Sequence, residues 1–348
     1  PPSLEAGLKY LVQSAVGSIF VLLGVALVLA QAATLDLAEI QAFVQSGAGQ
    51  TLPLLAAGAL FVIGFGVKVA LVPLHTWLPD AHAQAPSGIS ALLSGVVIEA
   101  GLLALLRSLS VLAATSNIWG MLLLGFGVSN MLVGNLLALR QTQVKRLLAF
   151  SSIAHVGYML VGLGIAVYAG EMAGAQGSFF HLLSHGLMKG LAFLSAGVLL
   201  YVLHTAVHDH SPLTIADLAG TAQRYPLVAL VLSIALLGLG GLPPLVGFMS
   251  KWQILVAGAA TRNAVVIAII AFVALNSVIS LGYYAPIVNT VYRREPSAAV
   301  VGGTAVPRLM VLPLLLLAVA VVAIGVWPNL VGWLVEPAGA ALLAAFGG

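Results

Sequence analysis

Long apolar runs recur along almost the whole chain, and each is long enough to cross a lipid bilayer as a helix. Because water does not reach a backbone inside the bilayer, its N–H and C=O groups must be paired within the segment, which favours helices. The sequence therefore predicts an all-α, polytopic transmembrane helical bundle. About nine runs reach the required length of about 20 residues, at roughly 5–30, 53–72, 87–112, 117–140, 144–168, 178–203, 226–255, 262–290 and 307–330.

The composition excludes several classes of protein. Hydrophobic residues make up 61% of the 348 residues and charged residues only 7%, too few to coat a soluble domain of this size. Connections between the runs are short, so we expect one domain over 1–348. The absence of cysteine excludes disulfides and cysteine-ligated iron–sulfur clusters. No nucleophile–base pair or phosphate-binding loop supports a soluble enzyme activity, and the small, scattered formal charge of +3 does not indicate nucleic acid.

Basic residues divide unequally between the two ends of the predicted helices. Following the runs along the chain puts only Arg107 and Arg262 on one face. Lysine and arginine are enriched on cytoplasmic loops, so the opposite face is predicted to be cytoplasmic, in a multi-pass protein of a bacterial or archaeal inner membrane. The cytoplasmic set is Lys9, Arg140, Lys145, Arg146, Arg224, Arg293, Arg294 and Arg308.

Four ionisable residues fall inside the apolar runs: Lys68, Glu99, Lys189 and Lys251. A charge at the bilayer centre costs about 2.5–3.5 kcal/mol on insertion scales, so together they represent on the order of 10 kcal/mol. Packing alone does not require such residues, and they indicate an ion path. The alternative for a lysine near a helix end is that its long side chain reaches the interface.

Two of these lysines lie beside predicted helix breaks. Pro73 follows Lys68 closely, and it has no N–H to donate and clashes with the carbonyl four residues earlier. The stretch 238–244 (GLGGLPP) precedes Lys251 by about two turns and should free the carbonyls of Leu239 and Gly240. Broken helices of this kind are typical of ion sites in repeat-built transporters. The alternative is that the kinks only shape helix packing.

His181, His185 and Lys189 recur at four-residue spacing, which confines them to about an 80° arc of one helix face. Histidine can exchange a proton near neutral pH, so we interpret this stripe as part of a proton relay. A metal site would need a third ligand, which is not evident. A purely structural role, with the histidines hydrogen-bonded across helices, also stays open.

Another histidine, His155, follows Ser151 and Ser152 in the run that begins with the basic pair at 145–146. These groups can extend a hydrogen-bonded proton path, although serines also serve close packing in membrane helices. A further polar group occupies the connection before residue 226 and is predicted to be a solvated loop without a role: His204, His208, Asp209 and His210.

Four stretches of the sequence resemble one family of membrane subunits. Together they resemble the antiporter-like, proton-translocating subunits, which include subunits L, M and N of complex I, the large Mrp-type sodium/proton antiporter subunits, and membrane subunits of energy-converting hydrogenases. The short tail after Glu336 favours M-like, Mrp-like or hydrogenase-type members, because subunit L would require a long lateral helix. The stretches are KVALVPLHTWLPDAHAQAP (68–86), RLLAFSSIAHVGY (146–158), HLLSHGLMKGLAFLSAG (181–197) and GLPPLVGFMSK (241–251).

The resemblance implies two inverted five-helix repeats, with the remainder of the first over 1–112, the second over 113–290, and a C-terminal helix and tail over 291–348. It implies no cofactor on this chain. The expected partners are other membrane subunits and a peripheral redox arm that carries flavin, iron–sulfur clusters or nickel. The predicted proton relay comprises Lys68, Glu99, His155, His181, His185, Lys189 and Lys251, with Lys251 on the outlet side.

Two features depart from the family pattern. Glu99 stands where many members carry lysine or histidine, which reverses the charge at a relay position. The glutamate that resembles the partner of Lys68 would lie before Pro1. Because the chain begins with a membrane helix at Pro1 and has no initiator methionine, we expect it to be a portion of a longer protein.

The sequence therefore predicts a proton-translocating membrane subunit of a complex I-type NADH:quinone oxidoreductase or a related redox-driven pump, with no catalytic redox centre on this chain. The alternative is a subunit of a multi-subunit sodium/proton antiporter without redox chemistry. A structural spacer that moves no ions is a third hypothesis, and the cost of the intramembrane charges argues against it.

Overall fold

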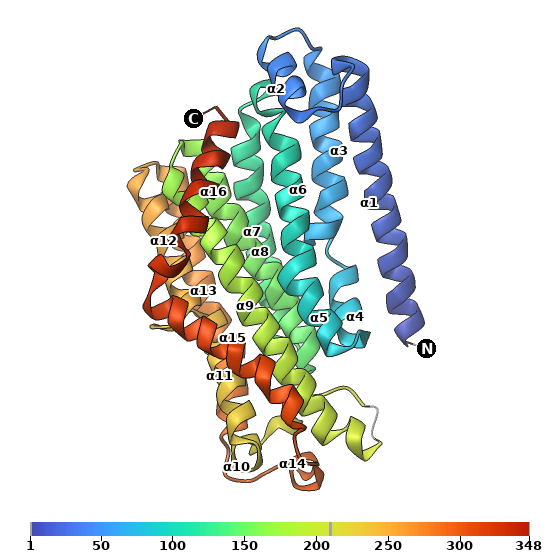
Figure 1. Cartoon of the computed structure of the whole chain (residues 1–348), viewed down its shortest axis with the longest axis vertical. Helices are drawn as coiled ribbons and strands as arrows, with labels where there is room; N and C mark the ends of the chain where they lie inside the picture. The colour runs from blue at the N-terminus through green and yellow to red at the C-terminus, as the bar shows by residue number, and fades with distance from the viewer. Residues whose placement is uncertain (1, 209–210, 348) are drawn as a thin grey trace.

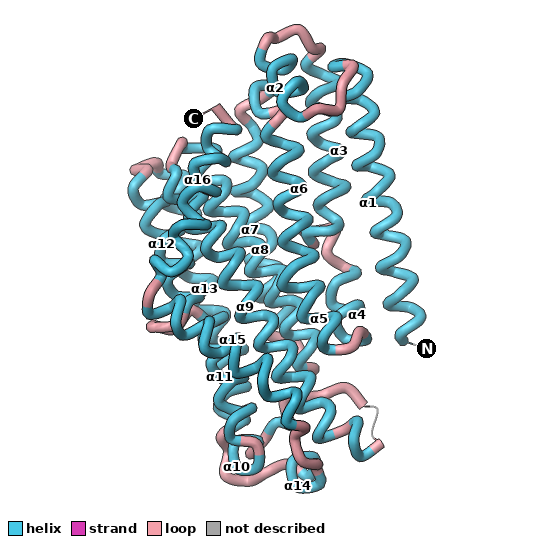
Figure 2. Tube along the Cα trace, in the orientation of Figure 1, coloured by secondary structure: helices cyan, strands magenta, loops and turns pink. Residues whose placement is uncertain are grey.

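The chain forms a bundle whose long helices run roughly along its longest axis (Figure 1). The computed structural model describes residues 2–208 and 211–347, and within these ranges short loops join the helices (Figure 2). Eight helical segments of this part are long and apolar enough to cross a membrane. They are α1 (Pro2–Ala32), α3 (Thr51–Val69), the segment Ser87–Ser110, α7 (Ile118–Ala138), α8 (Val144–Ala169), α9 (Met172–Leu203), α13 (Ala264–Val291) and α15 (Arg308–Val326).

Shorter helices complete the bundle. The segment Ser87–Ser110 is itself composite, because a π-helical turn at Leu93–Val97 separates α5 (Ser87–Leu92) from α6 (Ile98–Ser110). The remaining helices are α2 (Leu37–Gln45), α4 (Trp77–Gln84), α10 (Thr221–Arg224), α11 (Pro226–Gly240), α12 (Val246–Ala260), α14 (Ala298–Gly302) and α16 (Gly332–Ala345).

The first predicted break is confirmed directly after Lys68. Helix α3 ends at Val69, and Ala70 adopts a left-handed backbone with φ 59°. The Asn130 side chain of α7 serves both sides of the break, because its Oδ1 accepts from Val72 N at 2.9 Å and its Nδ2 donates to Ala70 O at 3.1 Å. Two backbone groups of the interrupted segment are therefore satisfied from the neighbouring helix, as buried backbone groups must be.

The second break divides a run that was predicted to be one span. Residues 226–255 are not continuous, because α11 ends at Gly240 and α12 begins at Val246. Gly241 ends the first half with φ 84°, a conformation that glycine adopts without a Cβ penalty. Neither Pro243 nor Pro244 can donate a backbone hydrogen bond to continue the helix. The predicted release of the Leu239 and Gly240 carbonyls is confirmed, since both accept side-chain donors.

The expected C-terminal tail is a helix. Helix α16 lies against α9, where a Cβ added at Gly339 would come within 2.6 Å of Gln176 Cγ. Glycine therefore permits the close approach of these two helices. This helix forms although Gly332, Pro337 and Gly339 weaken the local helix signal, because its packing on α9 outweighs their low helix propensity.

Helix α8 forms the centre of the bundle. Every residue from 144 to 166 except Arg146 is buried, an unusually complete burial for one helix. Its packing on α7 is close at Gly134, where a Cβ would meet Ala154 N at 2.6 Å. By contrast, α1 and α15 expose large apolar side chains such as Leu11 and Leu316 along their outer faces. Side chains aimed from α8 therefore meet protein on all sides, whereas the outer helices present surface suited to lipid.

The direction of each helix decides at which end of the bundle its basic residues lie. The N-terminus of α1 lies at the same end of the bundle as α4, α10 and α14, and α2 lies at the other end (Figure 1). At the first end, Asp80 pairs with both Lys9 and Arg146 at 2.8 and 3.2 Å. Which end faces the cytoplasm stays a prediction from the charge distribution.

Candidate functional site

Six of the seven predicted relay residues lie in the middle of the bundle, on four different helices. None is more than 7% exposed. The set is Glu99 on α6, His155 on α8, His181, His185 and Lys189 on α9, and Lys251 on α12. Ionisable side chains so deeply buried require polar partners, because an isolated buried charge is very costly.

Glu99 and His185 form a direct pair between α6 and α9. The distance from His185 Nδ1 to Glu99 Oε1 is 2.9 Å. The two helical segments approach closely because both carry glycine here: a Cβ at Gly95 would lie 3.0 Å from Gly186 O, and a Cβ at Gly186 would lie 3.2 Å from Glu99 Oε2. The Glu99 carboxylate therefore has a partner that can carry the opposite charge.

His155 connects the two histidines of the α9 stripe. Its Nδ1 lies 2.9 Å from His181 Nε2, and the two rings stack with an interplanar angle of 4°. The centroids of the His155 and His185 rings are 5.2 Å apart. His181 continues the line, because its Nδ1 lies 2.8 Å from Ser250 Oγ. Neutral imidazole and hydroxyl groups each donate and accept, so this arrangement can pass a proton between neighbours.

Lys189 ends the α9 stripe within a shell of oxygen atoms. Its Nζ donates to Leu148 O at 2.7 Å and to the Ser151 hydroxyl. Ser151 also donates to Leu148 O, at 2.8 Å. The start of α8 thus supplies the hydrogen-bond partners of this amino group, which is fully buried.

Lys251 occupies the second helix break. Its Nζ donates to Leu239 O at 2.9 Å and to Ser277 Oγ at 3.2 Å, and it lies 4.6 Å from the centroid of the Tyr158 ring. The break therefore frees a carbonyl that serves as a lysine ligand, and the aromatic face adds a favourable cation–π contact. Lys251 follows Ser250 in sequence, so it stands at the end of the histidine line.

Lys68 is not part of this line. It lies in the last turn of α3, is half-buried, and makes no hydrogen bond or ion pair with any residue of 2–208 or 211–347. Its Cβ packs beside Gly101 of α6, where an added Cβ would be 3.2 Å away. The sequence grouped Lys68 with the other lysines by residue type and by its helix break, and neither property states which side of the bundle a side chain faces.

Sequence reasoning missed several polar residues of the site. Ser250 is hydrogen-bonded to His181, and its position directly before a predicted relay lysine was the available signal. Ser94 was also missed, and it shares a hydrogen bond of 2.7 Å with Ser152, which the sequence did single out. His82, on α4, is fully buried and stacks on Phe193 of α9 with ring centroids 4.7 Å apart. It lies within the stretch 68–86 that carries the resemblance, yet no role was assigned to it.

The polar connection before residue 226 is only partly a solvated loop. His208 is exposed, but His204 is 3% exposed, with Nδ1 3.1 Å from Ser211 O and Nε2 3.6 Å from Asp217 Oδ2. That prediction was therefore wrong for His204, because the connection folds back over the end of α9. Asp209 and His210 lie outside the described residues. Within the described ranges, no three histidine, cysteine, aspartate or glutamate side chains gather as a metal site would require.

Known proteins are similar to this chain in sequence. The family model described as "NADH:quinone oxidoreductase/Mrp antiporter, TM" matches residues 1–280. Hydrogenase-4 component B of Escherichia coli (strain K12) is 35% identical over 263 residues, which cover 72% of this chain and 37% of that protein. NADH-quinone oxidoreductase subunit N of Trichlorobacter lovleyi is 36% identical over 292 residues, which cover 83% and 57%. The chain thus spans less than two thirds of either relative's length.

A solved structure gives the same result for the fold. The chain is similar to a chain of respiratory complex I from Thermus thermophilus, with a TM-score of 0.74 and 30% sequence identity. The match covers 94% of this chain and 68% of that one. The bundle with its two interrupted helices is therefore shared over almost all of its length.

Proposed function

The chain belongs to the NADH:quinone oxidoreductase/Mrp antiporter transmembrane family, and on that premise we propose that it carries protons as a subunit of a complex I-type NADH:quinone oxidoreductase or a related redox-driven pump. It is an integral, multi-pass membrane protein. The redox chemistry belongs, in this proposal, to partner subunits that hold flavin, iron–sulfur clusters or nickel. This chain supplies the path through the membrane.

The observation that carries the proposal is the succession of short contacts through the bundle centre. From Glu99 the contacts run to His185 at 2.9 Å, by ring contact to His155, and then to His181 at 2.9 Å. Ser250 follows at 2.8 Å, directly before Lys251. A structural role for one buried histidine is common, but three histidines joined through His155 between an acid and a lysine are hard to explain by packing alone.

Proton movement along this line uses each imidazole in both protonation states. A proton accepted by one ring nitrogen releases the proton on the other nitrogen to the next group. The charge of Lys251 provides a switch, because a unit charge about 4 Å away is worth about 4 kcal/mol at an effective dielectric of about 20. That energy changes a proton affinity by about three orders of magnitude. A redox-linked shift of a neighbouring charge is therefore sufficient in size to drive release on the Lys251 side.

The test uses the complete complex, purified through a tag and reconstituted in lipid vesicles with a pH-sensitive dye. Lys251→Ala and His181→Ala are expected to lose proton uptake while the complex stays assembled. Arg107→Ala, at the predicted opposite face and outside the line, is the matched control and should pump normally. Unchanged pumping by either relay variant in an assembled complex would contradict the proposal.

A second candidate is a subunit of a sodium/proton antiporter without redox chemistry. The description of the matching family supports this candidate, because it names the Mrp antiporter together with NADH:quinone oxidoreductase. The same purification separates the two. Co-purification of a flavin or iron–sulfur redox arm, with proton uptake that depends on electron flow, supports the pump. Proton movement that depends on a sodium gradient, in a complex of membrane subunits alone, supports the antiporter.

We also keep the repeat assignment as part of this proposal. The first break, after Lys68, would belong to a first repeat whose remainder is 1–112, and the second break, before Lys251, to a second repeat over 113–290. Each break carries one lysine and has its freed backbone groups bound by a buried side chain, Asn130 in the first and Lys251 in the second. This parallel supports the assignment.

A further inference from the structure

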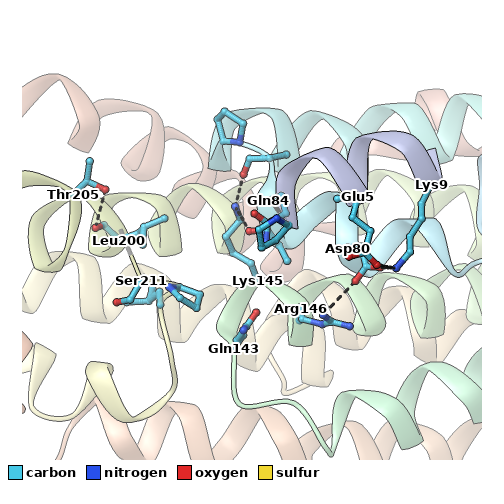
Figure 3. A pocket seen from close by; sticks show the side chains of 17 residues that line it. Glu5, Lys9, Asp80, Gln84, Gln143, Lys145, Arg146, Leu200, Thr205 and Ser211 are labelled. Carbon is cyan, nitrogen blue, oxygen red and sulfur yellow. Dashed lines mark hydrogen bonds and ion pairs between the residues drawn. The ribbon is translucent and has the colours of Figure 1, made fainter. Parts of the chain in front are cut away.

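A cavity of about 920 Å³ opens at the end of the bundle where α1, α4 and α8 meet. Its rim is charged, because Asp80 receives Lys9 Nζ at 2.8 Å and Arg146 Nη1 at 3.2 Å (Figure 3). Glu5 also pairs with Lys9, at 2.7 Å. A cavity of this size and polarity holds many water molecules.

Lys145 marks the inner wall of this cavity. It lines the cavity but is only 8% exposed, and its Nζ donates to Ala83 O at 3.4 Å and to Ala85 O. These carbonyls belong to the end of α4 and the residue after it. Lys145 therefore fixes the end of α4, directly after His82.

His82 lies inward of that wall. Its side chain is fully buried, and neither ring nitrogen has a hydrogen-bond partner among residues 2–208 and 211–347. The backbone is held, because Ser90 Oγ donates to His82 O at 3.3 Å, and the ring is held by its stack on Phe193. Buried polar atoms are satisfied by protein or by water. Two unpaired nitrogens on a fixed ring next to a polar cavity therefore indicate water on both sides.

The other side of His82 faces the relay. Phe193 lies one helical turn beyond Lys189 on α9, and Lys189 and Lys145 are both near enough to act electrostatically on the His82 ring. The His82 ring is in turn near enough to His185 to act on it electrostatically. The imidazole thus stands between the cavity, which Lys145 lines, and the inner end of the relay at Lys189.

We propose that His82 is the entry residue of the proton path, which transfers protons from water in the charged cavity to Lys189. The inference rests on the proposed function and names the inlet that the relay itself lacks. A proton from cavity water adds to one nitrogen of the neutral ring, and the proton on the other nitrogen leaves through water to the neutral amine of Lys189. One proton enters and one leaves. A half-turn of the ring about χ2 keeps it parallel to Phe193 and turns the unprotonated nitrogen back toward the cavity, where it can accept the next proton.

The surroundings suit a transfer residue better than a proton store. Burial of the ring, and positive charge on Lys189 or Lys145, disfavour a lasting positive charge on the imidazole. The neighbouring His75 offers a contrast in the same interrupted segment. It is 9% exposed and does not line the cavity, and no stacking contact joins its ring to another aromatic ring in the described ranges.

The test compares His82→Gln, His82→Ala and the control His75→Gln in the assembled, reconstituted complex, with assembly checked by co-purification of all subunits. Positioned acid–base groups contribute about 100-fold or more to proton transfer, so both His82 variants should slow proton uptake by about that factor. His75→Gln should pump normally. Added imidazole should restore uptake in His82→Ala, because the cavity admits a small molecule and the substitution leaves space beside Phe193.

The outcomes separate this inference from the proposed function. Normal pumping by His82→Gln, together with lost pumping by Lys251→Ala, overturns the inlet and leaves the relay intact. Normal pumping by both overturns the proposed function itself. A His82→Ala defect that imidazole does not restore indicates a packing role for the ring and also counts against the inlet.

Discussion

Replacing Glu99 by glutamine tests whether the reversed charge at this position drives the relay. Glutamine keeps the size of the side chain and can still bond to His185, but it removes the negative charge. At the observed separation of 2.9 Å, two unit charges attract by about 6 kcal/mol at an effective dielectric of about 20. Loss of that attraction lowers the population of the protonated His185 state by at most about four orders of magnitude, because the cost of burying the charged carboxylate offsets part of the attraction. We therefore expect Glu99→Gln to assemble normally and to lose proton uptake.

The assay is dye-monitored proton uptake by the reconstituted complex, with electron transfer measured in the same vesicles. Glu295→Gln is the matched control, because Glu295 is exposed and lies outside the line. Glu99→Asp should retain part of the activity, since it keeps the charge at a longer distance. Wild-type proton uptake by Glu99→Gln would refute the reasoning, because the pair would then act only as a neutral hydrogen bond.

Three further predictions concern the fold that holds the site. Gly134→Val should destabilise the detergent-solubilised protein or block its assembly, because its Cβ would meet α8 backbone at 2.6 Å, whereas Gly125→Val, with nothing within 4 Å, should be neutral in thermal unfolding. Asn130→Ala should lower the free energy of unfolding by about 1–3 kcal/mol by leaving buried break groups unpaired, and Ser129→Ala is the control; equal melting temperatures would contradict this. Asp80→Asn should change stability by less than about 1 kcal/mol, because its ion pairs are partly exposed.

Periodicity and residue chemistry predicted the local features well. The four-residue spacing of His181, His185 and Lys189 required one helix face, and the structure has that face turned inward. Pro73 and the 238–244 stretch located both breaks because proline removes a donor wherever it occurs. These are properties of short segments, which a sequence displays directly.

Contacts between segments that are far apart in the sequence could not be predicted from such local patterns. Glu99 and His185 are 86 positions apart, and their pairing depends on the glycines that let two helices approach. The same limit explains why Lys68 was grouped with residues it does not touch. His82 was overlooked because a sequence does not display burial or unpaired ring nitrogens.

The π-helical turn at Leu93–Val97 amounts to a one-residue insertion in an otherwise regular helix. Each residue of an α-helix rotates the chain by about 100°, so everything after this turn is offset by that angle relative to an uninterrupted helix. Glu99 is the second residue after the turn. If all of these residues formed a regular α-helix instead, the carboxyl group would swing about a quarter of the way around the helix axis and away from α9. The orientation of the acid in the line is thus set by one extra residue in the turn before it, which itself takes no part in the chemistry.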